Sequence, residues 1–117
     1  MRRFFDGDLT INLSDYHVLK QSTFNLRARV WVYAANTGSW HFLTVPTEVS
    51  AEIKKKFGMR AIGWGSLKVN VTVGKTTWNT SLFFDRKRNA YLLPLKADVR
   101  KKEKIEKGSE IAVIIII

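Results

Sequence analysis

The 117-residue sequence contains no cysteine, and this absence excludes disulfide scaffolds and thiolate metal sites. Its two histidines, His17 and His41, leave little for a histidine-based metal centre. We therefore expect no metal site and no cofactor. The absence of cysteine also agrees with a cytoplasmic protein, because disulfides are rare in that compartment.

The sequence also lacks a long apolar run. Near the N-terminus, Asp6 and Asp8 interrupt the apolar residues well short of the roughly 7 to 15 that a signal peptide needs. Residues 111–117, IAVIIII, would extend only about 10 Å as a helix, whereas a bilayer requires about 20 apolar residues. We therefore expect no secretion signal and no contact with a membrane.

Catalytic signatures are missing as well. The stretch VGKTT at 73–77 ends like a phosphate-binding loop, but Val69 stands where that motif needs a glycine, and the motif needs a helix after it. His41 has no serine or aspartate partner at a recognisable spacing, and we interpret it as a packing or hydrogen-bonding residue. We predict no catalytic residues and no enzyme.

Acidic residues are scarce in the second half of the chain. Residues 1–53 hold five lysines and arginines against five acids, whereas residues 54–117 hold fifteen against five, so the whole net charge of +10 lies there. Three basic clusters carry most of it, at Lys54–Lys56, Arg86–Arg88 and Arg100–Lys102. A field of one sign attracts polyanions, and it also keeps a protein soluble without any dedicated partner.

The hydrophobic residues that are present mostly alternate with polar ones, which is typical of half-buried strands. This pattern predicts strands near 24–33, 40–45, 67–73, 76–84, 90–95 and 110–117. Gly74 and Lys75 suit a tight type II′ turn between two of them. Residues 47–57 have helical spacing and end in lysines followed by Gly58, so we predict one clear helix there and a shorter one near 96–102.

The second half repeats the order of the first. When Pro94 is aligned with Pro46, a strand, a short helix, a glycine and a further strand follow in both halves at a spacing of 48 residues. Closure of an antiparallel sheet removes its exposed edges. We therefore predict a mainly β fold, a closed or nearly closed antiparallel barrel of about six strands, built from two related halves.

Four ordered blocks carry a resemblance to a known family: WHFLTVP at 40–46, GWGSLKV at 63–69, TTWNTSLF at 76–83 and YLLPLKADVRKKEKIEKGSEIAV at 91–113. They resemble the domain-of-unknown-function family nineteen-oh-five, some of whose members carry a YdeI/OmpD-associated tail. The resemblance covers roughly residues 24–117. It implies a compact β-barrel with a helix or two and no established activity. The blocks do not include the tail, so nothing of it is carried over.

We interpret residues 24–117 as one barrel domain and residues 1–23 as an extension that packs on the barrel or on a partner subunit. The terminal strand has two apolar faces, with Ile114 and Ile116 on its outer side. Alternating Leu9, Ile11 and Leu13 of the extension could cover that side, or a second subunit could do so in a homodimer.

Candidate binding residues fall into two groups. The first is an anion-binding group, in which Lys96 and Arg100 are four residues apart on one helix face; its members are Lys68, Lys96, Arg100, Lys101 and Lys102. Pairing of Arg100 with Asp98 or Glu103 is the structural alternative. The second is an aromatic pocket of Trp40, Trp64 and Tyr91, where Trp64 stands between two glycines; packing inside the barrel is the alternative.

Three functions follow from these patterns. The first is a binding module for an anionic partner, nucleic acid before any other polyanion, whose binding weakens with salt. The second is a small-ligand or protein-interaction domain that uses an aromatic surface and depends little on salt. The third is an enzyme of unrecognised type, which needs convergent polar groups with shifted pKa values in a cleft.

Overall fold

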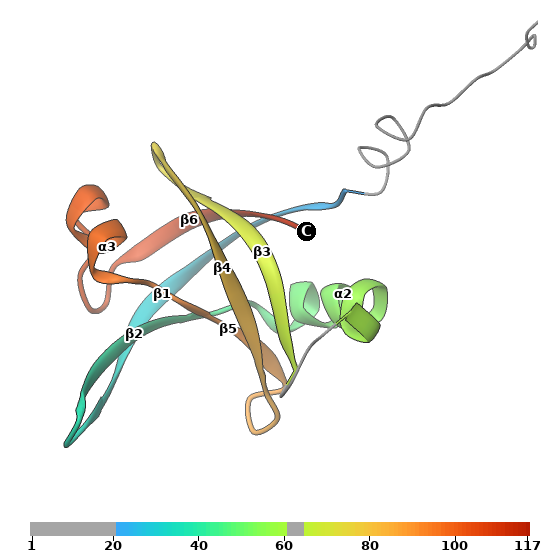
Figure 1. Cartoon of the computed structure of the whole chain (residues 1–117), viewed down its shortest axis with the longest axis horizontal. Helices are drawn as coiled ribbons and strands as arrows, with labels where there is room; N and C mark the ends of the chain where they lie inside the picture. The colour runs from blue at the N-terminus through green and yellow to red at the C-terminus, as the bar shows by residue number, and fades with distance from the viewer. Residues whose placement is uncertain (1–20, 61–64) are drawn as a thin grey trace, which may run out of the picture.

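A computed structural model describes residues 21–60 and 65–117 of the chain. Figure 1 shows the elements in chain order: β1 (Thr23–Ala35), β2 (Gly38–Thr44), α2 (Thr47–Phe57), the short 3-10 helix η1 (Gly58–Arg60), β3 (Ser66–Val73), β4 (Thr76–Asp85), β5 (Ala90–Pro94), α3 (Ala97–Glu103) and β6 (Glu110–Ile116). The predicted helix at 47–57 is confirmed, and the predicted helix at 96–102 lies at 97–103.

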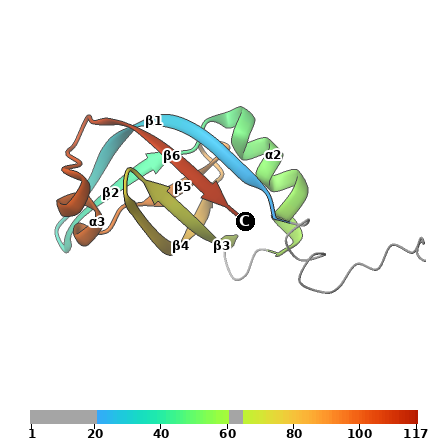
Figure 2. The ribbon, with the colours of Figure 1, turned by 90° about the horizontal axis from the view of Figure 1, so that it is seen from above.

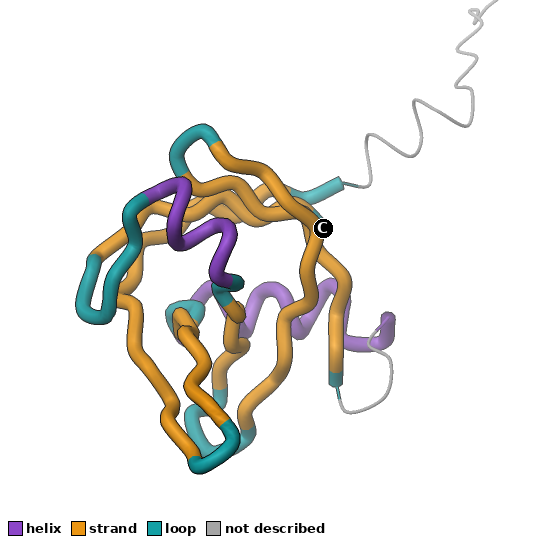
Figure 3. Tube along the Cα trace, turned by 60° about the vertical axis from the view of Figure 1, so that its left-hand side comes forward, coloured by secondary structure: helices purple, strands orange, loops and turns teal. Residues whose placement is uncertain are grey.

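The six strands form a closed antiparallel barrel in the order β1-β2-β5-β4-β3-β6, which confirms the predicted fold. Figure 3 shows the strands around a common centre. The closing pair is β1 with β6, in which Leu26 lies opposite Val113. Because each of these strands has a neighbour on both sides, the barrel exposes no long open edge.

The barrel is filled by the apolar side of each strand. The largest fully buried side chains include Leu43, Leu82, Leu93 and Ile115. Helix α2 contributes Ile53 and Phe57 to this core, and the ring of Phe57 meets that of Phe24 edge to face at 6.4 Å. Figures 1 and 2 both place α2 and α3 at opposite ends of the barrel.

The turn between β3 and β4 forms as the sequence predicts. Gly74 has a φ of +57°, and a Cβ built on it would lie 2.1 Å from Oε1 of Glu103. The glycine therefore serves both the tight turn and the close approach of α3, whose Glu103 accepts a hydrogen bond from Thr76. Gly74 and Lys75 join two strands here, which excludes the phosphate-loop interpretation of this stretch.

The order of elements repeats, as predicted, but at a different offset. Exchanging β1, β2, α2 and β3 for β4, β5, α3 and β6 leaves the order of strands around the barrel unchanged. The amide of Val45 donates to the carbonyl of Tyr91 (2.8 Å), and in the equivalent place the amide of Leu95 donates to the carbonyl of His41 (2.9 Å). The two halves therefore correspond at 50 residues, from 45 to 95 and from 41 to 91, and not at the 48 that separates the prolines.

At this offset Ser50 in α2 and Arg100 in α3 are equivalent residues. The hydroxyl of Ser50 donates to the carbonyl of Val45 (3.0 Å), and Nε of Arg100 donates to the carbonyl of Leu95 (3.0 Å). Each side chain thus ties its helix to the residue two positions before the helix begins. The consequence is that an arginine, and not a small hydroxyl, stands where α3 meets the barrel.

The terminal strand β6 presents its two faces as the alternation predicts. Val113 and Ile115 are buried in the core, whereas Ile114 on the outer side is 38% exposed. Leu9, Ile11 and Leu13, which the sequence offers as a cover, lie outside the described residues, as does the predicted extension up to residue 20. The homodimer through Ile114 and Ile116 stays a prediction. No helix in the described residues is long and apolar enough to cross a membrane.

Candidate aromatic face and anion-binding cleft

Four aromatic side chains line the outer side of the β1–β2 hairpin. The antiparallel register sets Trp31 opposite Phe42 and Tyr33 opposite Trp40, and the ring centroids of these pairs are 5.2 and 6.0 Å apart. We call Trp31, Tyr33, Trp40 and Phe42 the aromatic face. Tyr33 is 54% exposed and Trp40 is 44% exposed, so the face presents ring surface to solvent. Figure 1 shows the hairpin extending outward from the barrel.

One end of the aromatic face is fixed by Arg88 of the β4–β5 turn. Its guanidinium lies 4.4 Å from the ring centroid of Trp31 and pairs with Asp85. The hydrogen bond from Arg88 holds the pKa of the Asp85 carboxyl below its usual value. The indole nitrogen of Trp31 donates to Oγ1 of Thr44 (2.9 Å), which keeps this ring against the sheet. The guanidinium of Arg88 therefore lies against the ring of Trp31, whose orientation the hydrogen bond to Thr44 fixes.

At the other end of the face the barrel wall parts and leaves a cleft. Strand β5 pairs with β2 at Phe42–Thr44 and with β4 at Phe83–Asp85, and after Leu95, whose amide still donates to His41, the chain enters α3. Beyond that point β2 and β4 face each other with no strand between them. The resulting cleft has a volume of about 340 Å³, and its lining includes Trp40, His41, Trp78, Thr80, Lys96 and Arg100. Trp40 belongs to both the cleft and the aromatic face.

Two cations, Lys96 and Arg100, line this cleft. Lys96 is the N-cap residue of α3, and Arg100 follows one turn later. The ion pairs found among residues 21–60 and 65–117 are Lys56 with Glu52 and Arg88 with Asp85, so neither cleft cation has a carboxylate partner there. The alternative pairing of Arg100 with Asp98 or Glu103 is not seen, and Glu103 binds Thr76 instead.

His41 gives the cleft its one unusual polar atom. Its Nδ1 is buried and has no hydrogen-bond partner within the described part of the chain. Burial, and after it the charge of Arg100, lower the pKa of His41 below its usual 6.5, so the ring is neutral at physiological pH. A buried polar atom without a partner is destabilising by about 1–3 kcal/mol. Because this nitrogen has essentially no accessible surface, an occupant of the cleft cannot reach it in this conformation.

The predicted anion-binding residues do not all come together. Lys96 and Arg100 line the cleft, whereas Lys101 and Lys102 are exposed on α3 and are not part of its lining. Lys68 is exposed on β3 and lines a separate open groove beside Ile116. The structure therefore supports a pair of cations, and not a cluster of five.

The predicted aromatic pocket is not assembled as a group. Trp40 is exposed, but Tyr91 is only 2% exposed and packs edge to face on Phe84 at 5.1 Å, inside the barrel. Burial raises the pKa of the Tyr91 hydroxyl. Tyr91 shares the inward side of β5 with Leu93, which is why it cannot share a surface with Trp40. Trp64 lies outside the described residues.

Several residues of the site escaped prediction from the sequence. The sequence indicated only a packing or hydrogen-bonding role for His41, and it did not single out Trp78, which joins the core and also lines the cleft. The signal that could have found Tyr33 and Phe42 is the NTGS turn, because a two-residue turn there sets the register that pairs them with Trp40 and Trp31.

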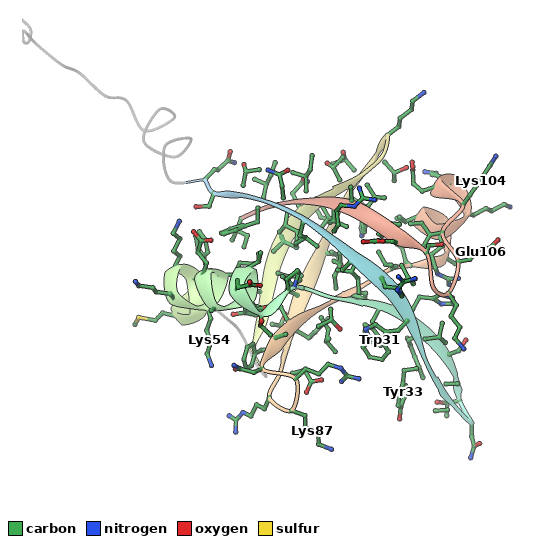
Figure 4. All side chains as sticks on the ribbon, turned by 180° about the vertical axis from the view of Figure 1, so that it is seen from behind. Trp31, Tyr33, Lys54, Lys87, Lys104 and Glu106 are labelled. Carbon is green, nitrogen blue, oxygen red and sulfur yellow. The ribbon has the colours of Figure 1, made fainter. Side chains whose placement is uncertain are left out.

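The basic clusters lie on both sides of the aromatic face. In Figure 4, Lys54 of α2 and Lys87 of the β4–β5 turn lie along the same lower side of the molecule as Trp31 and Tyr33, while Lys104 lies at the far end beside α3. The ammonium of Lys54 stands 4.2 Å from the ring centroid of Phe84, next to that turn. Two clusters are therefore neighbours at the Trp31 end, and the third lies at the Trp40 end.

Comparison with known proteins gives a family and no function. No curated protein matches the chain. Within the described part of the chain, no group of three or more histidine, cysteine, aspartate or glutamate side chains could hold a metal ion. The model of one family, described as Domain of unknown function (DUF1905), matches residues 26–115, which is most of the chain and nearly all of the barrel. The protein with this barrel, aromatic face and cleft therefore belongs to the DUF1905 family.

Proposed function

We propose that this protein is a non-catalytic binding module for an anionic partner, single-stranded nucleic acid, and that it binds through the aromatic face. The observation that carries the proposal is the row of exposed rings with cations at both ends. Arg88 stands at the Trp31 end, and Lys96 and Arg100 stand at the Trp40 end. Proteins that bind single strands combine aromatic side chains that stack on bases with a basic path for the backbone.

The geometry favours a single strand over a duplex. Stacking on Tyr33 and Trp40 requires base faces that are free, and these are available only where the bases are unpaired. The two aromatic pairs lie at alternate positions along neighbouring strands, so all four side chains lie on the same side of the hairpin. The net charge of +10 adds long-range attraction for any polyanion.

The test is fluorescence anisotropy of labelled single-stranded oligonucleotides at low salt. If Arg88, Lys96 and Arg100 contact phosphates, the logarithm of the binding constant should fall against the logarithm of salt with a slope of about −2. Trp40→Ala removes one stacking surface and should weaken binding by about 1–3 kcal/mol. No detectable binding at low salt overturns the proposal.

A matched pair of charge reversals distinguishes binding at the cleft from attraction by the net charge of the whole protein. Lys96→Glu and Lys68→Glu change the net charge equally, but Lys96 lines the cleft and Lys68 lies on another groove. We expect Lys96→Glu to weaken binding clearly more than Lys68→Glu, or than Lys101→Glu on the outer side of α3. Equal effects of all three would mean that the charge acts only as a diffuse field.

The aromatic face also suits a protein or small-ligand partner. The favouring observation is the exposure of Tyr33 and Trp40, because large exposed aromatics are enriched at protein interfaces. That function predicts binding with little salt dependence, so the salt slope discriminates between the two. Either partner fits a cytoplasmic protein, which the absence of cysteine also favours.

A further inference from the structure

The cleft between β2 and β4 is a second feature beside the aromatic face, and the barrel architecture alone does not produce it. At the 50-residue offset between the halves, Trp40 and Arg100 correspond to Ala90 and Ser50. Ala90 and Ser50 are both 0% exposed, whereas Trp40 is 44% exposed and Arg100 is half-buried. The cleft is therefore opened by residues that are particular to one half of the chain.

The guanidinium of Arg100 is fixed in the lining of this cleft. Its Nε donates to the carbonyl of Leu95 (3.0 Å), and its terminal nitrogens have neither a hydrogen-bond nor a carboxylate partner among the residues that the structure describes. An arginine that is already held at Nε loses less conformational freedom when it binds a ligand, and its planar end matches two oxygens of one phosphate. Arg100 is thus a pre-positioned group for an anion.

Lys96 adds a second positive charge to the same lining. The amide of Arg100 donates to the carbonyl of Lys96 (3.1 Å), so the two residues lie one helical turn apart, and both border the cleft. His41, the remaining titratable group of the lining, is neutral, and its Nδ1 is out of reach. An occupant of the cleft therefore meets two positive charges and no negative one.

The charge of the cleft favours one kind of phosphate. An internal phosphate of a nucleic acid carries one negative charge, whereas a phosphomonoester carries about −1.5 to −2 at pH 7 and has three acceptor oxygens. Two unpaired cations match the phosphomonoester in charge. When Arg100 binds two of its oxygens, the third is left for Lys96. The cleft therefore suits the phosphorylated end of a strand better than its interior.

We propose that the cleft binds a terminal phosphomonoester of a single strand on Arg100 and Lys96, while the adjoining nucleotides lie on the aromatic face. This inference rests on the proposed function. Trp40 belongs to both the aromatic face and the cleft, so a strand that stacks on this ring reaches the two cations without a break in its path. A free phosphomonoester offers the same chemistry, and the experiment distinguishes the two sources.

The experiment measures the anisotropy of one internally labelled single-stranded sequence at a fixed low salt concentration. The sequence is made in three forms, with a 5′-phosphate, with a 3′-phosphate, and with hydroxyls at both ends. We expect one phosphorylated form to bind about tenfold more tightly than the hydroxyl form, which is the effect of about one hydrogen bond between charged groups. Binding of all three forms with equal affinity overturns the inference and leaves the proposed function standing.

Two variants of α3 distinguish contact from general attraction, because a terminal phosphate also raises the charge of the oligonucleotide. Lys96→Gln and Lys101→Gln remove the same charge, but only Lys96 lines the cleft. We expect Lys96→Gln to lose most of the preference for the phosphorylated form and Lys101→Gln to keep it. Arg100→Lys retains the charge without the planar end and should also reduce the preference. If Lys96→Gln is folded in thermal unfolding and keeps the full preference, or if both glutamine variants lose it equally, the inference is overturned.

Glycerol phosphate is the probe for a free phosphomonoester, and its binding is followed by tryptophan fluorescence, since Trp40 and Trp78 line the cleft. We expect it to bind much more weakly than the phosphorylated strand, because it makes no contact with the aromatic face. Equal affinity of the two overturns the strand end as the source of the phosphate. Binding of glycerol phosphate by a protein that binds no strand supports a phosphomonoester site in the cleft and overturns the proposed function. No binding of either ligand overturns both.

Discussion

Among single residues, His41 most clearly departs from its expected role. Its carbonyl takes part in the ladder between the two halves by accepting from Leu95, as a strand residue should. Its ring, however, has a buried nitrogen without a partner in the described residues and lies near a guanidinium. Nearly all buried polar groups in proteins are paired, so this unpaired nitrogen is destabilising.

The lowered pKa of His41 predicts how stability depends on pH. Because the folded protein holds this ring neutral, the unfolded chain binds more protons below its pKa of 6.5, and stability therefore falls as pH falls below that value. We expect the urea midpoint of the wild type to decrease between pH 7.5 and 5.5, and that of His41→Phe to decrease less. The window lies above the range in which Asp85 titrates, since the pKa of that carboxyl is lowered.

The comparison with His41→Phe is needed because the chain has a second histidine, His17, which lies outside the described residues. His17 is present in both proteins, so its effect cancels in the difference. An equal loss of stability in the two proteins would contradict the account of His41.

At the scale of elements, Ser50 joins α2 to β5. Its hydroxyl donates to the carbonyl of Val45 and accepts from the amide of Tyr91, both at 3.0 Å, and the residue is fully buried. Ser50 is the only buried polar or charged residue among those that the structure describes. Its two bonds hold the helix that closes one end of the barrel against the strand that ends at the cleft.

Replacing Ser50 by alanine removes both hydrogen bonds and leaves the Val45 carbonyl and the Tyr91 amide without this partner. We expect Ser50→Ala to lower the free energy of unfolding by about 1–3 kcal/mol, measured by urea denaturation. Ser81→Ala on the outer side of β4 provides the control and should change it by less than about 0.5 kcal/mol. An equally small effect at both positions would show that the link between α2 and β5 contributes little.

The strands and helices could be predicted from the sequence because each depends on local patterns. Alternation in β1 and β6 identified which side faces the core, and the spacing of Ile53 and Phe57 identified α2. The cleft could not be predicted, because it depends on where β5 ends relative to β2 and β4, and no local pattern contains that information. For the same reason Lys68 was grouped with Lys96, although the barrel sets them in different grooves.

For the whole molecule, closure of the barrel positions the charges. The three basic clusters are separated in the sequence, and the fold brings two of them to the Trp31 end of the aromatic face and one to the Trp40 end. The outer face around Ile114 also carries cations, because Arg27 lines the groove at Ile114 and Lys68 lines the groove at Ile116. The aromatic face differs from it in combining cations with exposed rings.

The most direct test of this account is an NMR titration of the labelled full chain with a single-stranded oligonucleotide. Among its four tryptophans, Trp31 and Trp40 report on the aromatic face and Trp78 reports on the core. We expect the indole signals of Trp31 and Trp40 and the amides of the β1–β2 hairpin to shift, while the amides of Thr72 and Ile114 on the opposite sheet face do not. Shifts confined to that opposite face, or no shifts at low salt, would contradict the account.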